Sequence, residues 1–82
     1  MNTLVIYDIT EDKIRNKVAE VCKDYGLTRI QWSAFLGELS NNHREELYSK
    51  LIKTLKDNAG NIQIFPICSK DILLKKEISN GG

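Results

Sequence analysis

The sequence predicts an α+β domain in which two helices cover one face of an antiparallel sheet. Short segments rich in β-branched and aromatic residues alternate along the chain with longer segments whose apolar residues recur every three or four positions. The chain has 82 residues, which is the size of one domain. We expect a single domain over residues 1–78 and a flexible tail over 79–82, where the chain reads SNGG.

The N-terminal part of the chain predicts a strand followed by a helix. Residues 2–9 contain the nearly continuous apolar run LVIY, which is typical of a central strand. The next residues, TED, supply capping oxygens and negative charge where a helix begins. From Ile14 to Tyr25 apolar residues return at helical spacing, and Gly26 stands where a C-terminal cap belongs. We therefore expect a helix over 12–25.

The middle of the chain predicts a hairpin and a second helix. Apolar and polar residues alternate over 28–39, and we expect a reversal near Trp32 to Ala34 that divides this run into two strands. The alternation places four residues on one face of the sheet: Arg29, Gln31, Ser33 and Phe35. The capping cluster SNNHREE and the apolar residues after it predict a helix over 42–57.

The last predicted elements are strands. Residues 62–67, IQIFPI, have strand composition, but Pro66 cannot donate a ladder hydrogen bond, so the strand lies at an edge or ends there. LLKKEIS is compatible with a final short strand. The resulting order is that of a ferredoxin-like β-α-β-β-α-β antiparallel sheet with both helices on one face.

Such a sheet has a second face that no helix covers. We expect Trp32, Phe35, Phe65 and neighbouring apolar residues there, and these are too many for a solvated sheet face. A second copy of the chain would cover them. The sequence therefore predicts a homodimer.

Composition excludes several classes of protein. Twelve lysine and arginine residues against 11 aspartate and glutamate leave a net charge of +1, so any nucleic-acid contact must come from a local patch. Cys22 and Cys68 have no zinc-ligand spacing, and we expect both to be buried. No apolar segment is long enough to span a bilayer and the N-terminus is not a signal peptide, so we expect a cytoplasmic protein that binds no membrane.

Asp8 is the first candidate for chemistry, because it ends an apolar strand. It either caps the turn into the first helix or helps to bind a divalent cation. One carboxylate is a poor metal site by itself. If the uncovered faces of two chains meet about a two-fold axis, the two Asp8 side chains could hold Mg²⁺ or Mn²⁺ between them.

Basic residues are the other candidates. Arg15 and Arg29 could meet phosphate through the guanidinium fork, or could be ordinary surface charges. We interpret Lys17 as surface charge on the residues alone, since Glu20 lies close to it on the same helix. His43, the only histidine, is expected to be exposed at the start of the second helix.

Three stretches of the chain together resemble a known family. VIYDIT followed by the K-x-R-N-K-V run, and then GLTRIQWSAFLGEL, are similar to the CRISPR-associated Cas-two family, and the similarity extends through IQIFPI. It covers most of residues 1–67. The resemblance implies a ferredoxin-like homodimer in which a C-terminal strand reaches across to extend the partner's sheet.

The resemblance also implies site residues and activity. Asp8 matches the catalytic, metal-binding aspartate, contributed by both subunits with Mg²⁺ or Mn²⁺ as cofactor. Lys17 stands where some members have arginine. Supporting or substrate-contacting positions are matched by Tyr7, Arg15, Arg29 and Phe35. Members act as endonucleases on single-stranded RNA or double-stranded DNA, and as the dimer that holds foreign DNA for an integrase during spacer acquisition.

These observations leave alternative functions open. The first is a metal-dependent endonuclease of CRISPR spacer acquisition, cutting RNA or DNA phosphodiesters as a homodimer. The second is a non-catalytic DNA-binding adapter that scaffolds the CRISPR integrase. A toxin-like messenger RNA nuclease or a small ligand-binding regulatory module is suggested by the fold alone.

Overall fold

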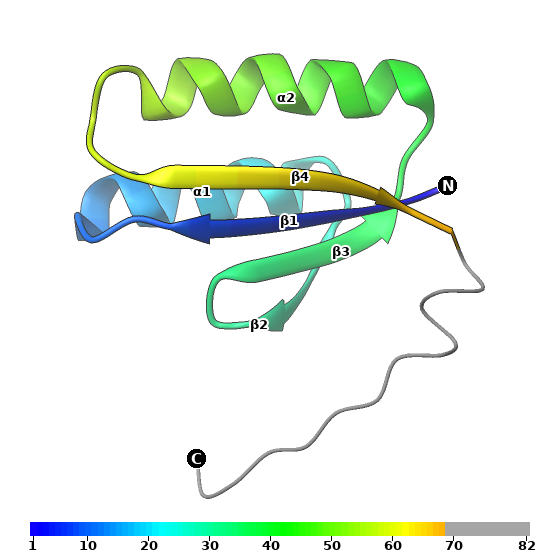
Figure 1. The fold of residues 1–82 in the computed structure, drawn as a ribbon, viewed down its shortest axis with the longest axis horizontal. Helices are drawn as coiled ribbons and strands as arrows, with labels where there is room; N and C mark the ends of the chain where they lie inside the picture. The colour runs from blue at the N-terminus through cyan, green and yellow to red at the C-terminus, as the bar shows by residue number, and fades with distance from the viewer. Residues whose placement is uncertain (69–82) are drawn as a thin grey trace, which may run out of the picture.

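The computed structural model describes residues 1–68 and contains the predicted elements in the predicted order. They are β1 (Asn2–Asp8), α1 (Asp12–Asp24), β2 (Thr28–Gln31), β3 (Ala34–Glu38), α2 (Asn41–Leu55) and β4 (Asn61–Ile67). Both helices lie on the same side of the sheet (Figure 1). The ferredoxin-like layout is therefore confirmed. The further strand considered in LLKKEIS and the tail over 79–82 lie outside the described residues.

The four strands are ordered β2-β3-β1-β4, and all neighbours are antiparallel. β1 is central and β4 is at the edge, as predicted. β1 can be central because both of its faces are apolar: Val5 is buried on the helix side, whereas Leu4 and Ile6 point to the other side. Pro66 pairs with Thr3 near the end of β4, where a missing donor costs least.

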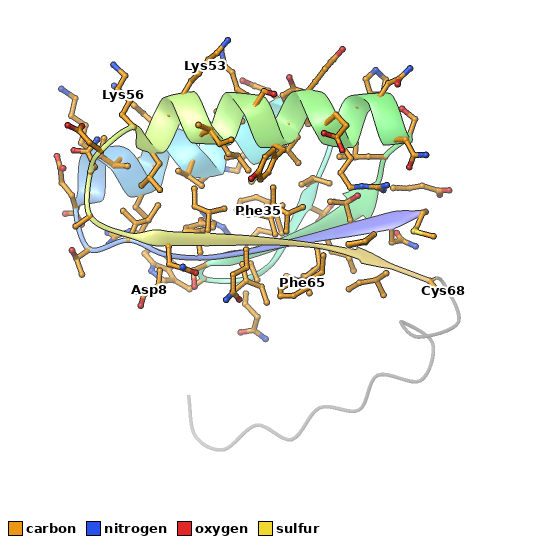
Figure 2. All side chains as sticks on the ribbon, turned by 45° about the horizontal axis from the view of Figure 1, so that its top comes forward. Asp8, Phe35, Lys53, Lys56, Phe65 and Cys68 are labelled. Carbon is orange, nitrogen blue, oxygen red and sulfur yellow. The ribbon has the colours of Figure 1, made fainter. Side chains whose placement is uncertain are left out.

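The hydrophobic core lies between the sheet and the helices. Phe35 from the sheet and Leu47 from α2 are fully buried there, and Leu51 is almost so. The residues that α1 buries follow the predicted stripe: Ile14, Val18, Ala19, Val21 and Cys22. Burial of one large side chain of this kind contributes about 1.5–3 kcal/mol. Phe35 thus faces the helices, and its predicted place on the uncovered face was wrong (Figure 2).

Two of the helix ends that the sequence marked have the expected geometry, whereas Glu11, the N-cap residue of α1, makes no side-chain capping bond and the capping expected from TED was wrong. The Ser40 hydroxyl accepts a hydrogen bond of 3.2 Å from the backbone N–H of His43, which caps the start of α2. His43 itself is exposed, as predicted. Gly26 has φ +84°, the left-handed conformation that ends many helices and that glycine adopts without strain.

The hairpin reverses at Trp32 and Ser33, which confirms the predicted break. A β-bulge between Arg29 and Gln31 then changes which residues share a face. Arg29 pairs with Phe35, whereas Gln31 pairs with Ala34, and neighbouring residues of β3 point to opposite faces. The prediction that Gln31 lies on the same face as Arg29 was wrong, because the bulge inserts an extra residue into the alternation.

The face of the sheet opposite the helices carries an apolar ladder. Leu4 of β1 pairs with Leu36 of β3 on one side and with Phe65 of β4 on the other. Ile6 is 38% exposed and Phe65 is 42% exposed. We call these four residues and the surface around them the open face.

The two cysteines differ. Cys22 is completely buried in α1, as predicted, and burial raises the pKa of its thiol to about 12. Cys68 is exposed, so the prediction that it is buried was wrong. It follows the last residue of β4 and lies beyond the part of the sheet that the helices cover (Figure 2). Neither helix of residues 1–68 is long and apolar enough to cross a membrane.

Candidate functional site

Asp8 is the last residue of β1 and is exposed on the open face (Figure 2). Within residues 1–68 its carboxylate accepts no hydrogen bond, and the N-cap position of α1 belongs to Glu11. The capping alternative for Asp8 therefore finds no support. A pocket of about 290 Å³ surrounds the end of β1 and is lined by Tyr7, Asp8, Ile9, Thr10, Arg15, Trp32 and Ser33.

The β2–β3 turn forms one wall of this pocket. The backbone N–H of Tyr7 donates a hydrogen bond of 3.0 Å to the carbonyl of Ser33, which ties the turn to the end of β1. This bond continues the β1–β3 ladder by one residue and leaves Trp32 at the tip of the hairpin. The indole of Trp32 is 70% exposed.

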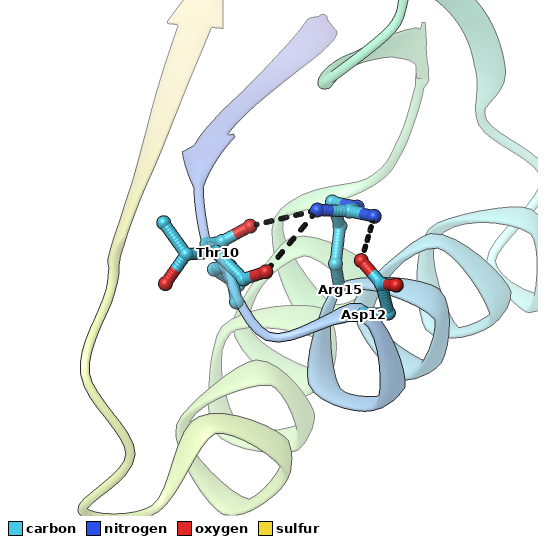
Figure 3. Close-up of polar contacts among 4 residues, drawn as sticks. Thr10, Asp12 and Arg15 are labelled. Carbon is cyan, nitrogen blue, oxygen red and sulfur yellow. Dashed lines mark hydrogen bonds and ion pairs between the residues drawn. The ribbon is translucent and has the colours of Figure 1, made fainter.

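Arg15 lines the same pocket from the first turn of α1. Its Nη1 donates to the backbone carbonyls of Ile9 at 3.3 Å and Thr10 at 3.4 Å, while its Nη2 pairs with the Asp12 carboxylate (Figure 3). The Nε of Arg15 is buried and has no partner among the described residues. Arg15 thus fixes the loop that follows Asp8 and keeps one donor unused.

Arg29 lies on the helix side of the hairpin, above two aromatic rings. Its guanidinium carbon is 5.1 Å from the centre of the Phe35 ring and 5.4 Å from that of Trp32. Phe35 in turn stacks on Tyr7, with 6.3 Å between ring centres. Because Phe35 is fully buried, it can position Arg29 and Tyr7 but cannot touch a substrate directly.

The hydroxyl of Tyr7 is a buried polar group at this site. It makes no hydrogen bond of good geometry with the described residues. Burial raises the pKa of this hydroxyl, and the nearby Arg29 guanidinium partly opposes the rise. Tyr7 is therefore a neutral hydrogen-bonding group at physiological pH.

Lys17 lies elsewhere. It lines a groove of about 440 Å³ between α1 and α2, together with Lys50, Lys53 and Lys56. None of these lysines has an ion-pair partner among the residues that the structure describes. The structure therefore brings Tyr7, Asp8 and Arg15 together in one pocket, with Arg29 and Phe35 behind it, and separates Lys17 from them.

A divalent cation fits this pocket only in part. Residues 1–68 contain no group of three or more histidine, cysteine, aspartate or glutamate side chains that could hold a metal ion. Asp8 is the sole carboxylate of the pocket, but it is exposed and its oxygens are unpaired within that part of the chain. Mg²⁺ keeps several waters and needs only one or two protein carboxylates beside a phosphate. One chain therefore supplies one suitable ligand.

Trp32 is the pocket residue whose place the sequence analysis missed. We had expected it on the uncovered sheet face, whereas it stands in the turn and contacts both arginines: the Arg15 guanidinium carbon is 5.7 Å from its ring centre. The sequence did contain a signal, because connections between strands run over the protein surface and Trp32 stands at the predicted reversal.

Comparison with known proteins identifies the family. The family model described as CRISPR associated protein Cas2 matches residues 1–73. The chain belongs to the Cas2 family. Its similarity to a Cas2 protein of Desulforudis audaxviator (strain MP104C), named CRISPR-associated endoribonuclease Cas2, is 51% identity over 78 residues, which covers 95% of this chain and 74% of the relative.

Two further relatives place the Cas2 family assignment in context. A CRISPR-associated endonuclease Cas1/endonuclease Cas2 fusion of Thermoproteus tenax (strain ATCC 35583 / DSM 2078 / JCM 9277 / NBRC 100435 / Kra 1) is 39% identical over 72 residues, covering 88% of this chain and 27% of the fusion. The crystal structure of Streptococcus pyogenes Cas2 at pH 6.5 has a TM-score of 0.82 at 21% identity, covering 96% of this chain and all of that one (100%). The latter comparison supports the fold alone.

Proposed function

We propose that this protein is a metal-dependent endonuclease of CRISPR spacer acquisition that cuts RNA or DNA phosphodiesters as a homodimer. One observation carries the proposal: the exposed Asp8 carboxylate, unpaired within residues 1–68, lies in a pocket whose other walls include Arg15. A carboxylate beside a guanidinium suits a metal ion and a phosphate bound side by side. The name of the 51% identical relative, an endoribonuclease, supports the same activity.

The open face supports the homodimer. Its apolar ladder would be buried if two copies met face to face, and Asp8 lies on that face at the end of β1. A two-fold axis through the open face would bring the Asp8 side chains of both subunits toward each other. The pair would then supply the two carboxylates that a shared Mg²⁺ or Mn²⁺ takes from protein.

Each side chain then has a defined task. When bound, the metal ion supplies Lewis acidity, which lowers the pKa of a water molecule and offsets phosphate charge. Asp8 would hold it. Arg29, fixed above Phe35 and Trp32, offers its fork to a phosphate oxygen, and Arg15 keeps the loop after Asp8 in place. Tyr7 stays neutral and so adds no negative charge near the phosphate.

The test is Asp8→Asn, which keeps the shape of the side chain but removes its charge. We expect cleavage of RNA and DNA oligonucleotides in Mg²⁺ to fall by roughly a hundredfold or more. Asp57→Asn, an exposed carboxylate outside the pocket, is the matched control and should cleave as the parent does. Equal cleavage by the folded Asp8→Asn protein would refute the proposal.

A second function, the non-catalytic adapter, is favoured by a different observation. The groove between α1 and α2 is lined by four lysines without ion-pair partners in residues 1–68 and by two acids, Glu20 and Asp24, and this excess of positive charge favours the phosphates of duplex DNA. The Thermoproteus fusion joins a Cas2 to a Cas1, so an integrase is the partner that we propose for such an adapter. In this case Asp8→Asn would leave duplex binding and spacer acquisition unchanged, whereas Lys50→Glu with Lys53→Glu would weaken duplex binding.

A further inference from the structure

Trp32 is far more exposed than the fold requires. At 70% it has the largest exposed fraction among the large apolar side chains of residues 1–68. It occupies a turn and packs into no part of the core. Large exposed aromatic residues are uncommon on protein surfaces and often mark a binding surface.

The indole is nevertheless held in place. The Tyr7–Ser33 backbone hydrogen bond fixes the turn, and the guanidinium groups of Arg15 and Arg29 lie 5.7 and 5.4 Å from the ring centre. Both arginines are themselves fixed, Arg15 by two backbone carbonyls and Arg29 by its position over Phe35. A ring that is already ordered loses little conformational freedom when a ligand binds to it.

The surroundings of Trp32 indicate the chemistry of its ligand. The ring is 70% exposed even though two guanidinium groups lie over it, and these groups favour an anion. A nucleotide combines both features, since its base stacks on aromatic rings while its phosphate pairs with arginine. In a duplex the base faces are already stacked on their neighbours, so only an unpaired base can lie on the indole.

We propose that Trp32 stacks an unpaired nucleobase next to the phosphate bound at the Asp8 pocket, and so selects single-stranded over double-stranded substrate. This inference deepens the proposed function and rests on it for the identity of the pocket. Trp32 would be a specificity-determining residue. Base stacking on an aromatic side chain is sequence-tolerant, because every base has a π-face.

The chain offers a direct probe, because Trp32 is its only tryptophan. The intact protein is titrated in EDTA, where a metal-dependent nuclease does not cut, with a short single strand, the same sequence as a duplex, and a single strand of abasic sites. Tryptophan emission and fluorescence anisotropy of the labelled strand are followed together. Of these three ligands, we expect only the single strand that carries bases to quench the tryptophan emission strongly.

Three variants complete the test. Trp32→Ala should weaken binding of the single strand by about tenfold and change duplex binding little, whereas Trp32→Tyr should keep most of the affinity. Tyr48→Ala removes another exposed aromatic ring, from α2 outside the pocket, and should bind as the parent does. Unchanged emission at saturation, or Trp32→Ala binding single strands as tightly as the parent, would overturn the proposal.

The remaining outcomes separate this inference from the proposed function. If Asp8→Asn still shows quenching by the single strand but also still cleaves, the nuclease proposal fails and the stacking role stands. If Asp8→Asn stops cleavage while Trp32 emission never responds, the stacking role fails and the nuclease proposal stands. If Trp32→Ala instead abolishes self-association in sedimentation and emission depends on protein concentration alone, a second copy covers the ring and the inference is wrong.

Discussion

Arg15 differs from what its position in the sequence suggests. On the helix it stands at the border of the apolar stripe, and the open question was whether it meets phosphate or solvent. The structure gives it a third task, because it binds the carbonyls of Ile9 and Thr10 and the Asp12 carboxylate. Only 24% of the side chain is exposed. The spacing of residues could not reveal these bonds, since they depend on the path of the loop.

Cys22 leads to a prediction about pH. The fold raises the pKa of its thiol from 9.0 to about 12 by burial, so the native state holds this proton more tightly than the unfolded chain does. The contribution of this protonated thiol to the free energy of unfolding is complete below pH 9.0 and is lost as pH rises toward 12. Within that range Cys22 should lower the free energy of unfolding by about 1.4 kcal/mol per pH unit.

Urea unfolding across this pH range measures the effect. Cys22→Ala leaves a cavity and is less stable at every pH, but its free energy of unfolding should fall less steeply above pH 9.0. Cys68→Ser changes an exposed thiol and should keep the parent's slope. Equal slopes for Cys22→Ala and the parent would contradict the prediction. Some slope persists above pH 10.0 in all three proteins, because burial also raises the pKa of Tyr7.

The α2–β4 connection supports the end of β1 through Gly60. This residue has φ +151°, and a Cβ atom there would lie 2.9 Å from Ile9 Cγ1 and 3.2 Å from the Asp8 carbonyl oxygen. The connection therefore packs directly against the backbone of Asp8. No side chain larger than hydrogen fits without moving one of the two segments.

Gly60→Ala should therefore destabilise the protein by about 1–3 kcal/mol and slow cleavage, because the added methyl group displaces the loop that carries Asp8. Urea unfolding and the cleavage assay measure the two effects. Gly26→Ala is the matched control: φ is +84°, but a Cβ there meets nothing within 4 Å. It should cost about 1 kcal/mol through backbone strain alone and leave cleavage unchanged. Equal cleavage by both variants would show that crowding at Gly60 does not reach the site.

Most elements could be predicted because their signals are local. The first helix was expected over 12–25 and spans Asp12–Asp24, and the reversal at Trp32 was placed correctly. The face on which Phe35 lies depends on the register of β3 against β1, where Phe35 pairs with the buried Val5, and no local pattern encodes this register. The bulge after Arg29 accounts for the misplaced Gln31.

At the scale of the whole molecule, the open face leads to a prediction about assembly. Phe65 is the residue that the edge strand β4 contributes to the apolar ladder, and it is 42% exposed. Phe65→Asp would place a charge in the proposed interface between two copies, where it would lack a partner. We expect this variant to sediment as a folded monomer and to lose cleavage, since each Asp8 would lack its partner.

Phe65→Leu keeps the interface apolar and should remain dimeric. Circular dichroism verifies folding of both variants, because Phe65 contributes nothing to the core between the sheet and the helices. A Phe65→Asp protein that still sediments as a dimer would exclude the open face as the interface. If it is monomeric and cleaves normally, one Asp8 is sufficient.

The candidate site could be predicted only in part, because some of its residues have local sequence signals and others do not. Asp8 stands out in sequence because it interrupts an apolar strand, and its exposure beside Arg15 agrees with that interpretation. Lys17 stands only two positions after Arg15 in the sequence. It nevertheless lines the groove between α1 and α2, because its side of α1 faces α2. Trp32 joins the pocket through the backbone bond between Tyr7 and Ser33 and through its contacts with Arg15 and Arg29. Long-range contacts of this kind are set by the fold.

That backbone bond has a practical consequence for engineering. It joins the backbone N–H of Tyr7 to the backbone carbonyl of Ser33 and so involves no side chain. Every residue has the carbonyl, and every residue other than proline has the N–H. The side chain at position 32 can therefore be varied freely, since it belongs neither to the core nor to a strand. A library of variants at this one position would sample ligand preference with little risk to folding.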